Sequence, residues 1–375
     1  MRVLYIENTP GFGGSLTGLL ELIDHMPSEI EPILVSSFDV LPYVDLSNRI
    51  KYECVNIPQP PLVHSGIVRG LMTYYQKSFR PWDKALDRIV RREKPDVIHA
   101  NNGCLINLAS AFVGKRNRIP TISHQKCFEY DGKLNRLLLR KTRYTHHIGT
   151  SPAISKHLVK LGLDPAKLST TFEPIRAPAN WTPPVDVSPI RIGMYSMITP
   201  WKGQDVFLDA IGLLSKRDVP LFRAVLAGSA PDGDTIFPAE LNQQIDRLGI
   251  GKLVEQKGQV KDMYGLLNQT EIAVHASVKP EPFGRVVAEA MICGLPVVVS
   301  DAGGPGEYVE HGVTGFCTPL RNAAALADAL EKLLVSADLR RKMGLAGREY
   351  ALRMFDPTRL AHEMSDLYKR LCKKA

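Results

Sequence analysis

Short apolar runs alternate with amphipathic stretches along most of the 375 residues, and this alternation restricts the fold more than any other feature. Strands separated by helical stretches predict parallel sheets with helical crossovers, and therefore an α/β fold. In the first half of the chain we predict strands at Arg2–Ile6, Pro32–Ser36, Asp96–Ala100, Pro120–Ser123 and His147–Thr150, with the longest helical stretch over Gly66–Glu93. In the second half we predict strands at Ile190–Tyr195, Phe222–Ala227, Leu253–Gly258, Ile272–Ala276 and Pro296–Ser300, and a closing helix over Pro357–Leu371.

A proline-rich segment separates the two series of strands. It contains Pro174, Pro178, Pro183, Pro184 and Pro189. Proline breaks helices and cannot donate to a strand ladder, so the segment predicts a linker. Because this length also suits two domains, we expect two Rossmann-like domains that face each other across a cleft, where ligands bind beyond the carboxyl ends of the strands. The expected bounds are residues 1–177, a linker at 178–189, and residues 190–356.

The composition indicates which classes of ligand the protein can bind. The net charge of +8 favours anionic ligands such as nucleotides, phosphorylated lipids or membrane surfaces, and no motif or interleaved aromatic pattern supports nucleic acid. The six cysteines are scattered without a C-x-x-C pair, which argues against a zinc site or a disulfide framework and favours a reducing compartment. With no apolar run near the roughly 18–20 residues of a membrane span and a first strand too short for a signal peptide, we predict a cytoplasmic protein.

The segment Val278–Gly304 carries the main chemical signal, VKPEPFGRVVAEAMICGLPVVVSDAGG. Glu281 follows a predicted strand, and Gly284 opens a helix whose second turn carries Glu289. The amides and dipole of a first helical turn suit a phosphate, and a glycine there permits close approach. Glu289 can accept hydrogen bonds from two ribose hydroxyls, which leaves Glu281 to face whatever lies beyond the phosphates. The alternative is a buried α/β unit with two solvated glutamates.

The pattern E-P-F-G-x-x-x-x-E, followed by A-M-x-x-G-x-P-V-V-x-S-x-x-G-G, resembles the E-x7-E signature of retaining GT-B glycosyltransferases of family 4 (glycosyl transferases group 1). Glu281 and Glu289 hold the signature positions, and Gly303-Gly304-x-x-Glu307 continues the pattern. The resemblance covers the second domain well and the first only at scattered points. It implies the GT-B fold, with the final helix, 357–375, packing back on the first domain. It also implies that Glu281 contacts the transferred sugar and that Glu289 contacts the nucleotide ribose.

A second family element is Pro200-Trp201-Lys202-Gly203-Gln204-Asp205, in which the resemblance assigns Lys202 to the donor diphosphate. The family usually has Gly-Arg a few residues earlier, and the arginine shares the diphosphate charge. This chain has Ser196-Met197 there. The missing arginine is expected to weaken leaving-group stabilisation by on the order of 2–4 kcal/mol unless Arg285, Lys126 or an acceptor-side group compensates. The expected donor-binding residues are Gly13, Gly14, Lys202, Gly203, Gly228, Gln259, Val260, Glu281, Phe283, Gly284, Arg285, Val286 and Glu289.

The first domain offers weaker signals. Gly13-Gly14 follows the first strand, and the resemblance makes it a loop that approaches the donor phosphate; a plain turn is the alternative. The family often places a histidine at the position of His124 to touch the sugar, so the expected catalytic set is Glu281, His124 and Lys202. His99, Asn101 and Asn102 follow from strand-end positions as acceptor-side residues.

Two further stretches bear on metals and membranes. Asp232-Gly233-Asp234 resembles a metal-binding D-x-D, but its Pro/Gly loop explains it as a turn, so no metal is assigned. The basic helix predicted over residues 133–147 presents leucines with Lys133, Arg136 and Arg140. It suits either a solvated basic face or peripheral contact with the inner membrane face.

The sequence therefore predicts a retaining transferase that moves a hexose-type sugar from a UDP- or GDP-sugar to a hydroxyl of a glycan, lipid-linked or small-molecule acceptor, as in polysaccharide biosynthesis, with no cofactor. Met197 motivates the alternative of a donor-binding protein with little or no transferase activity. A sugar-nucleotide epimerase and a nicotinamide-dependent oxidoreductase are further alternatives. Leu16 counts against the last of these, because it stands where a dinucleotide fingerprint needs glycine.

Overall fold

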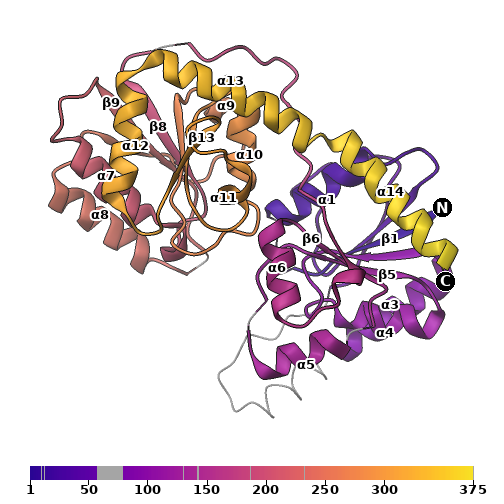
Figure 1. Ribbon diagram of the computed structural model, residues 1–375. Coiled ribbons are helices and arrows are strands. Elements are labelled where there is room, and N and C mark those ends of the chain that lie inside the picture. Colours follow the sequence, from indigo (N-terminus) through magenta and orange to yellow (C-terminus); the bar gives the residue numbers. More distant parts are fainter. Residues whose placement is uncertain are drawn as a thin grey trace. The chain divides into compact units, whose positions relative to one another are not determined.

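The computed structural model describes residues 1–9, 11, 13–56, 79–129, 131–141, 143–185, 187–231 and 233–374. The chain forms two compact units, shown in Figure 1: Met1–Pro174 together with Pro357–Ala375, and Ile175–Asp356. The division after Pro174 lies slightly before the boundary expected at 177, so the part of the proline-rich segment after Pro174 belongs to the second unit.

Trp181 attaches that segment to the second unit. Its indole N–H donates to the Cys293 carbonyl at 2.7 Å, and the Arg348 guanidinium lies 3.9 Å from the centre of its ring. Residues 178–189 were predicted as a linker, but Trp181 packs against its own unit, because a large aromatic side chain is more stable when buried.

The first unit is built on a parallel sheet with the strand order β3-β2-β1-β4-β5-β6-β7. Its strands are β1 (Arg2–Glu7), β2 (Glu31–Ser36), β3 (Lys51–Cys54), β4 (Val97–Ala100), β5 (Thr121–Gln125), β6 (His146–Gly149) and β7 (Leu168–Thr170). The helices are α1 (Gly14–Asp24), α3 (Arg80–Glu93), α4 (Leu108–Asn117), α5 (Lys133–Lys141), α6 (Pro152–Lys160) and α14 (Pro357–Lys374).

Alternation along β1 distributes the core of the first unit between the two faces of its sheet. Val3 and Tyr5 pack with apolar residues of α1 and α14, whereas Leu4 and Ile6 pack with α3 and α4. Successive strand residues point to opposite faces, so a strand covered on both sides must be apolar at nearly every position. Helix α14, the last helix, thereby covers one face of a sheet that contains the first strand, β1 (Figure 1).

The second unit repeats this plan with the strand order β10-β9-β8-β11-β12-β13. The strands are β8 (Ile190–Tyr195), β9 (Phe222–Ala227), β10 (Val254–Gln256), β11 (Ile272–His275), β12 (Val297–Ser300) and β13 (Gly315–Thr318). The helices are α7 (Gln204–Leu214), α8 (Ile236–Leu248), α9 (Met263–Leu267), α10 (Arg285–Ile292), α11 (Gly304–Tyr308), α12 (Ala323–Val335) and α13 (Ala337–Met354). Every strand pairing is parallel among the described residues of both units.

The prediction of two parallel α/β sheets is confirmed, and each predicted strand overlaps a strand of the structure. Strands β3, β7 and β13 were not predicted. The long helix expected over Gly66–Glu93 is α3 from Arg80 onward, and residues 66–78 lie outside the described part. The basic helix expected over 133–147 is wrong in extent: α5 ends at Lys141, and the Thr145 amide already donates to Thr121 at 2.8 Å, as in a strand ladder.

Each strand order reverses direction once, between β1 and β4 in the first unit and between β8 and β11 in the second. Loops that leave such a pair of strands run to opposite sides, which opens a crevice at the carboxyl edge of the sheet.

Candidate functional site

At the carboxyl edge of the second sheet, backbone from three neighbouring strands approaches closely. Gly228 follows β9 with a φ of +140°, and a Cβ there would meet the Ser196 carbonyl oxygen, after β8, at 1.9 Å. The Gly228 amide donates to Gly258, after β10, at 2.8 Å, and Ser229 donates to Gln259 at 2.8 Å. The loops carrying Gly228, Gln259 and Val260 therefore share one edge, as a site for a nucleoside requires.

The central feature of this edge is the carboxylate of Glu281. One of its oxygens, Oε2, accepts from Lys202 Nζ at 2.6 Å, from His275 Nε2 at 3.2 Å and from Ser277 Oγ at 3.3 Å. Lys202 comes from the segment after β8, whereas His275 and Ser277 come from the end of β11. The reversal of strand order thus brings together residues that lie almost eighty positions apart.

The environment keeps Glu281 ionised. Burial acts to raise the pKa of this carboxyl, but the hydrogen bond from His275 and the charge of Lys202 outweigh it and lower the pKa to about 2. A buried charge of this kind is tolerated only when it is paired and hydrogen-bonded. The site therefore presents a carboxylate held in one place, with its second oxygen, Oε1, left out of these three contacts.

Helix α10 begins beside this carboxylate. Gly284 has a φ of +78°, and a Cβ there would meet Pro305 Cγ at 2.6 Å. Tyr308 donates to the carbonyls of Phe283 and Gly284 at 2.9 and 3.0 Å, which fixes the turn into the helix. The capping position is Gly284, which has no side chain that could accept from the first amides of the helix. Such amides can bind an anion.

Glu289 lies one turn further along α10 and pairs with Arg285, with 2.9 Å between Arg285 Nε and Glu289 Oε1. Both side chains are largely buried. Glu289 is expected to contact a ribose and Arg285 a phosphate. To do so, each side chain must give up part of its ion pair with the other and bind the ligand in its place.

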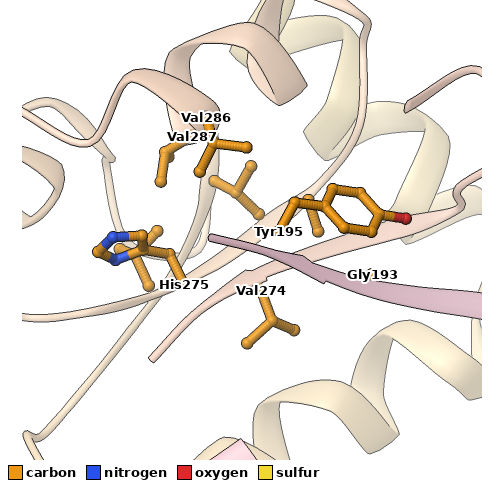
Figure 2. Close-up of a pocket in the computed structure, with 9 residues that line it drawn as sticks. Gly193, Tyr195, Val274, His275, Val286 and Val287 are labelled. Carbon is orange, nitrogen blue, oxygen red and sulfur yellow. The ribbon is translucent and has the colours of Figure 1, made fainter. Parts of the chain in front are cut away.

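A small apolar hollow lies behind His275, between the sheet and α10. Figure 2 shows its labelled residues: Val286 and Val287 of α10 lie over the strands that carry Tyr195 and His275, while the Val274 side chain points away from α10. These surroundings lower the local dielectric around the imidazole, which strengthens its bond to Glu281.

Met197 is 54% exposed at the position where an arginine was expected. Its backbone is nevertheless fixed, because the buried Gln204 amide donates to the Met197 carbonyl at 2.8 Å and to Ser196 Oγ at 3.0 Å. Gly203 follows Lys202 with a φ of +78° and starts α7. Hydrogen bonds therefore fix the backbone of this loop. At position 197, however, the loop exposes a thioether and not a cation.

The carboxyl edge of the first unit has its own buried carboxylate, Glu7 at the end of β1. It accepts from Thr9 Oγ1 at 2.8 Å and from the amides of Asn101 and Asn102, which follow β4. Burial raises the pKa of Glu7, and the donors, led by Asn101, offset part of that effect. Asn101 is fully buried in this network, and only Asn102 keeps partial exposure for an acceptor.

Lys126 is already neutralised within the same unit. Its ammonium lies 2.8 Å from Glu173, whose other oxygen accepts from Thr150 at 2.7 Å, and the side chains of both Lys126 and Glu173 are buried. It is therefore not a free cation that could replace the missing arginine. Gly13 and Gly14 are exposed at the start of α1, which no side chain caps.

The structure corrects the role expected for His99. This residue is fully buried, with Nδ1 2.7 Å from the Tyr368 hydroxyl and Nε2 3.2 Å from His124 Nδ1. Both ring nitrogens of His99 are occupied by these partners, so the ring has no free polar atom to offer an acceptor. His124 lies inside β5 and not beyond the strand end, and its Nε2 has no hydrogen-bond partner among the described residues.

The basic surface of α5 is partly neutralised. Arg136 makes an ion pair with Asp131 at 2.6 Å, and Arg140 lies against the backbone of Gly162. Leu137 is half-exposed while Leu139 is buried. In the described residues no helix is long and apolar enough to cross a membrane. Within the same ranges, no three or more His, Cys, Asp or Glu side chains are grouped to hold a metal.

Sequence reasoning missed His275, Ser277 and Glu7 as members of these edges. A signal was present, since each is a polar residue at the carboxyl end of a predicted strand. Tyr368 and Glu173 carried no such signal, because their partners lie far away in the sequence.

Taken together, the two Rossmann-like units define the GT-B fold. Over 99% of its length the chain resembles the crystal structure of Anabaena Alr3699/HepE in complex with UDP and glucose, with a TM-score of 0.81, 23% identity and 100% of that chain covered. Residues 181–350 match the model of the family described as glycosyl transferases group 1. The second unit is therefore similar to the glycosyl transferases group 1, and this match spans less than half of the chain.

Two curated relatives match part of the chain. The putative glycosyltransferase EpsD of Bacillus subtilis is 31% identical over 167 residues, which are 44% of this chain and 42% of that protein. The N-acetyl-alpha-D-glucosaminyl L-malate synthase of Bacillus anthracis is 29% identical over 165 residues, 44% of this chain and 41% of that enzyme. The matched region therefore spans less than half of the length of these relatives.

Proposed function

We propose that this protein is a retaining glycosyltransferase that transfers a hexose-type sugar from a nucleotide sugar, UDP- or GDP-linked, to a hydroxyl group. The observation that carries the proposal is the Glu281 cluster, which lies at the strand reversal of the second sheet and beside the glycine-capped start of α10. A buried, ionised carboxylate can accept hydrogen bonds from sugar hydroxyls, while helix amides and Lys202 bind a diphosphate.

The proposed reaction breaks the bond between the anomeric carbon and the phosphate oxygen. Negative charge then grows on the departing nucleoside diphosphate, where Lys202 and the amides of Arg285 and Val286 stabilise it. The acceptor oxygen attacks from the same face, and its proton passes to the leaving phosphate. Glu281 orients the sugar, Glu289 holds the ribose, and Gln259 and Val260 flank the base.

The proposed acceptor is a glycan, a lipid-linked or a small-molecule hydroxyl, and the chemistry uses no metal or cofactor of the protein's own. Its solved neighbour was crystallised with UDP and glucose, which supports a UDP-sugar as the first donor to test. All six cysteines are free, which supports a cytoplasmic setting. The exposed Leu137 and the cations of α5 support peripheral contact with the inner membrane face.

A panel of UDP- and GDP-sugars, followed by release of nucleoside diphosphate, tests this function. We expect turnover with one donor, and a loss of about two orders of magnitude or more on Glu281→Ala, as for other removed transition-state contacts. Glu331→Ala, in a partly buried ion pair on α12 away from this cluster, is the matched control and should turn over normally. Unchanged turnover in Glu281→Ala would overturn the assignment.

Met197 favours a second candidate, a sugar-nucleotide-binding protein with weak or no transfer. Calorimetric binding of UDP-glucose without turnover across a range of acceptors would support it over the first.

A further inference from the structure

A chain of hydrogen bonds crosses the core of the first unit from the C-terminal helix to β5. The Tyr368 hydroxyl on α14 lies 2.7 Å from His99 Nδ1 on β4, and His99 Nε2 lies 3.2 Å from His124 Nδ1 on β5. Tyr368 and His99 have no exposed surface and His124 is 2% exposed, so water does not compete for these bonds. The chain ends at His124 Nε2, which is buried and has no partner in the described ranges.

The protons in such a chain must be ordered in one direction. If Tyr368 donates to His99 Nδ1, then His99 carries its proton on Nε2 and donates to His124 Nδ1, and His124 must carry its own proton on Nε2. In the reverse order His99 donates to the phenol oxygen, and the Tyr368 hydrogen needs another acceptor.

The surroundings of Tyr368 favour the first order. The neighbouring phenol, Tyr5, has its ring edge-on to that of Tyr368, and the two hydroxyls interact. In the first order Tyr368 accepts from Tyr5 while it donates to His99. In the reverse order Tyr368 donates to Tyr5, and the Tyr5 hydrogen has no acceptor among the described residues. A buried hydroxyl hydrogen without an acceptor is destabilising. Burial also lowers the pKa of both His99 and His124, so both rings are neutral near pH 7 and each carries a single proton.

We propose that Tyr368 is a positioning residue that acts through His99 to fix His124 as the Nε2–H tautomer. His124 then meets its ligand as a hydrogen-bond donor, at a nitrogen whose proton no described residue accepts. The identity of that ligand as the transferred sugar rests on the proposed function, whereas the tautomer does not. The last helix of the chain thus determines the chemistry of a strand residue more than two hundred positions earlier.

Nitrogen-15 NMR of histidine-labelled full-length protein reads the tautomers directly. In the wild type, His99 and His124 should both show a protonated Nε2 and a lone pair on Nδ1. Tyr368→Phe removes one oxygen and should move His99, and with it His124, toward the Nδ1–H form. A wild-type His124 protonated on Nδ1 would overturn the proposal, as would tautomers that Tyr368→Phe leaves unchanged.

Two further variants separate the hydrogen-bond chain from general loss of packing. Tyr144→Phe removes another buried phenol oxygen of the first unit, which donates to carbonyls of Cys104 and Asn107, and should leave both tautomers unchanged. His99→Gln offers an amide N–H toward His124 and should preserve its Nε2–H form. If Tyr368→Phe does not fold, the spectra of the wild type and of His99→Gln still show whether His124 carries its proton on Nε2.

Binding distinguishes this proposal from the proposed function. Tyr368→Phe should weaken binding of UDP-glucose about fivefold, the value of one ordinary hydrogen bond, and leave the affinity for UDP unchanged. If the tautomers respond as expected but neither compound binds, the hydrogen-bond chain stands and the proposed donor is wrong. If both affinities fall equally in Tyr368→Phe, His124 is not the donor to the sugar.

Discussion

Replacing Glu281 by glutamine tests whether the carboxylate cluster is held together by charge. The substitution keeps the size of the side chain and imitates its protonated form. In the folded protein the pKa of Glu281 is lowered from 4.5 to about 2. One pKa unit corresponds to about 1.4 kcal/mol, so ionisation of Glu281 contributes about 3 kcal/mol to the free energy of unfolding at pH 7.

The pH dependence has a definite sign. Because the folded pKa is the lower one, the stabilisation is complete above the unfolded value of 4.5 and is lost as the pH falls toward about 2. Glu281→Gln should therefore cost about 3 kcal/mol at pH 7 and only about 1 kcal/mol at pH 3. The amide does not titrate, so the difference between the two proteins isolates this one group.

Urea unfolding of the full chain at a series of pH values measures this difference. Trp181 and Trp201 lie in the same unit as Glu281, and their fluorescence follows the unfolding of that unit. Glu331→Gln is the matched control, since its ion pair with Arg217 lies near the surface, where such pairs contribute only about 0–1 kcal/mol. A cost for Glu281→Gln that is the same at pH 7 and pH 3 would refute the reasoning.

Three other substitutions, one of them with a control variant, address single positions. Met197→Arg adds a fork-shaped cation to the loop before Lys202 and should tighten UDP binding about tenfold by calorimetry; an unchanged affinity would show that the loop does not face a phosphate. Gly228→Ala drives a Cβ into the Ser196 carbonyl and should cost more than about 2 kcal/mol in urea unfolding. Gly249→Ala, at a positive φ with open space, should cost only about 1 kcal/mol, so equal costs would contradict the close approach at Gly228. Lys202→Met removes the positive charge beside Glu281 and should raise the pKa of Glu281, measured by carbonyl carbon NMR. If that pKa stays near 2, His275 and Ser277 alone are enough to keep the carboxylate ionised.

The sequence predicted the central strands because they are buried on both faces and are therefore apolar at nearly every position. Strands β3 and β7 lie at sheet edges and are only partly buried, so Lys51–Cys54 and Leu168–Thr170 lack an apolar run. Strand β13 is buried but short and begins with glycine, which weakens the same signal.

The candidate site was predictable where the chemistry follows the backbone. Glu281, Gly284 and Glu289 lie on one loop and its helix, so their spacing alone indicated a shared site. The partners of Glu281 could not be predicted in the same way. Lys202 is far from Glu281 in the sequence, and only the reversal of strand order brings the two side chains together. The expectation for His99 failed for a related reason: whether a strand-end side chain faces solvent depends on the helix that covers it, and α14 comes from the other end of the chain.

Amide NMR of the labelled full chain during titration with UDP-glucose, and with UDP as the comparison, tests the central claim most directly. We predict that the largest shifts fall on the amides of Gly203, Gly228 and residues 285–287, and that Lys202→Met reduces them with both ligands. Shifts confined to other parts of the chain, or no binding of any nucleotide sugar, would contradict the assignment of this edge as the donor site.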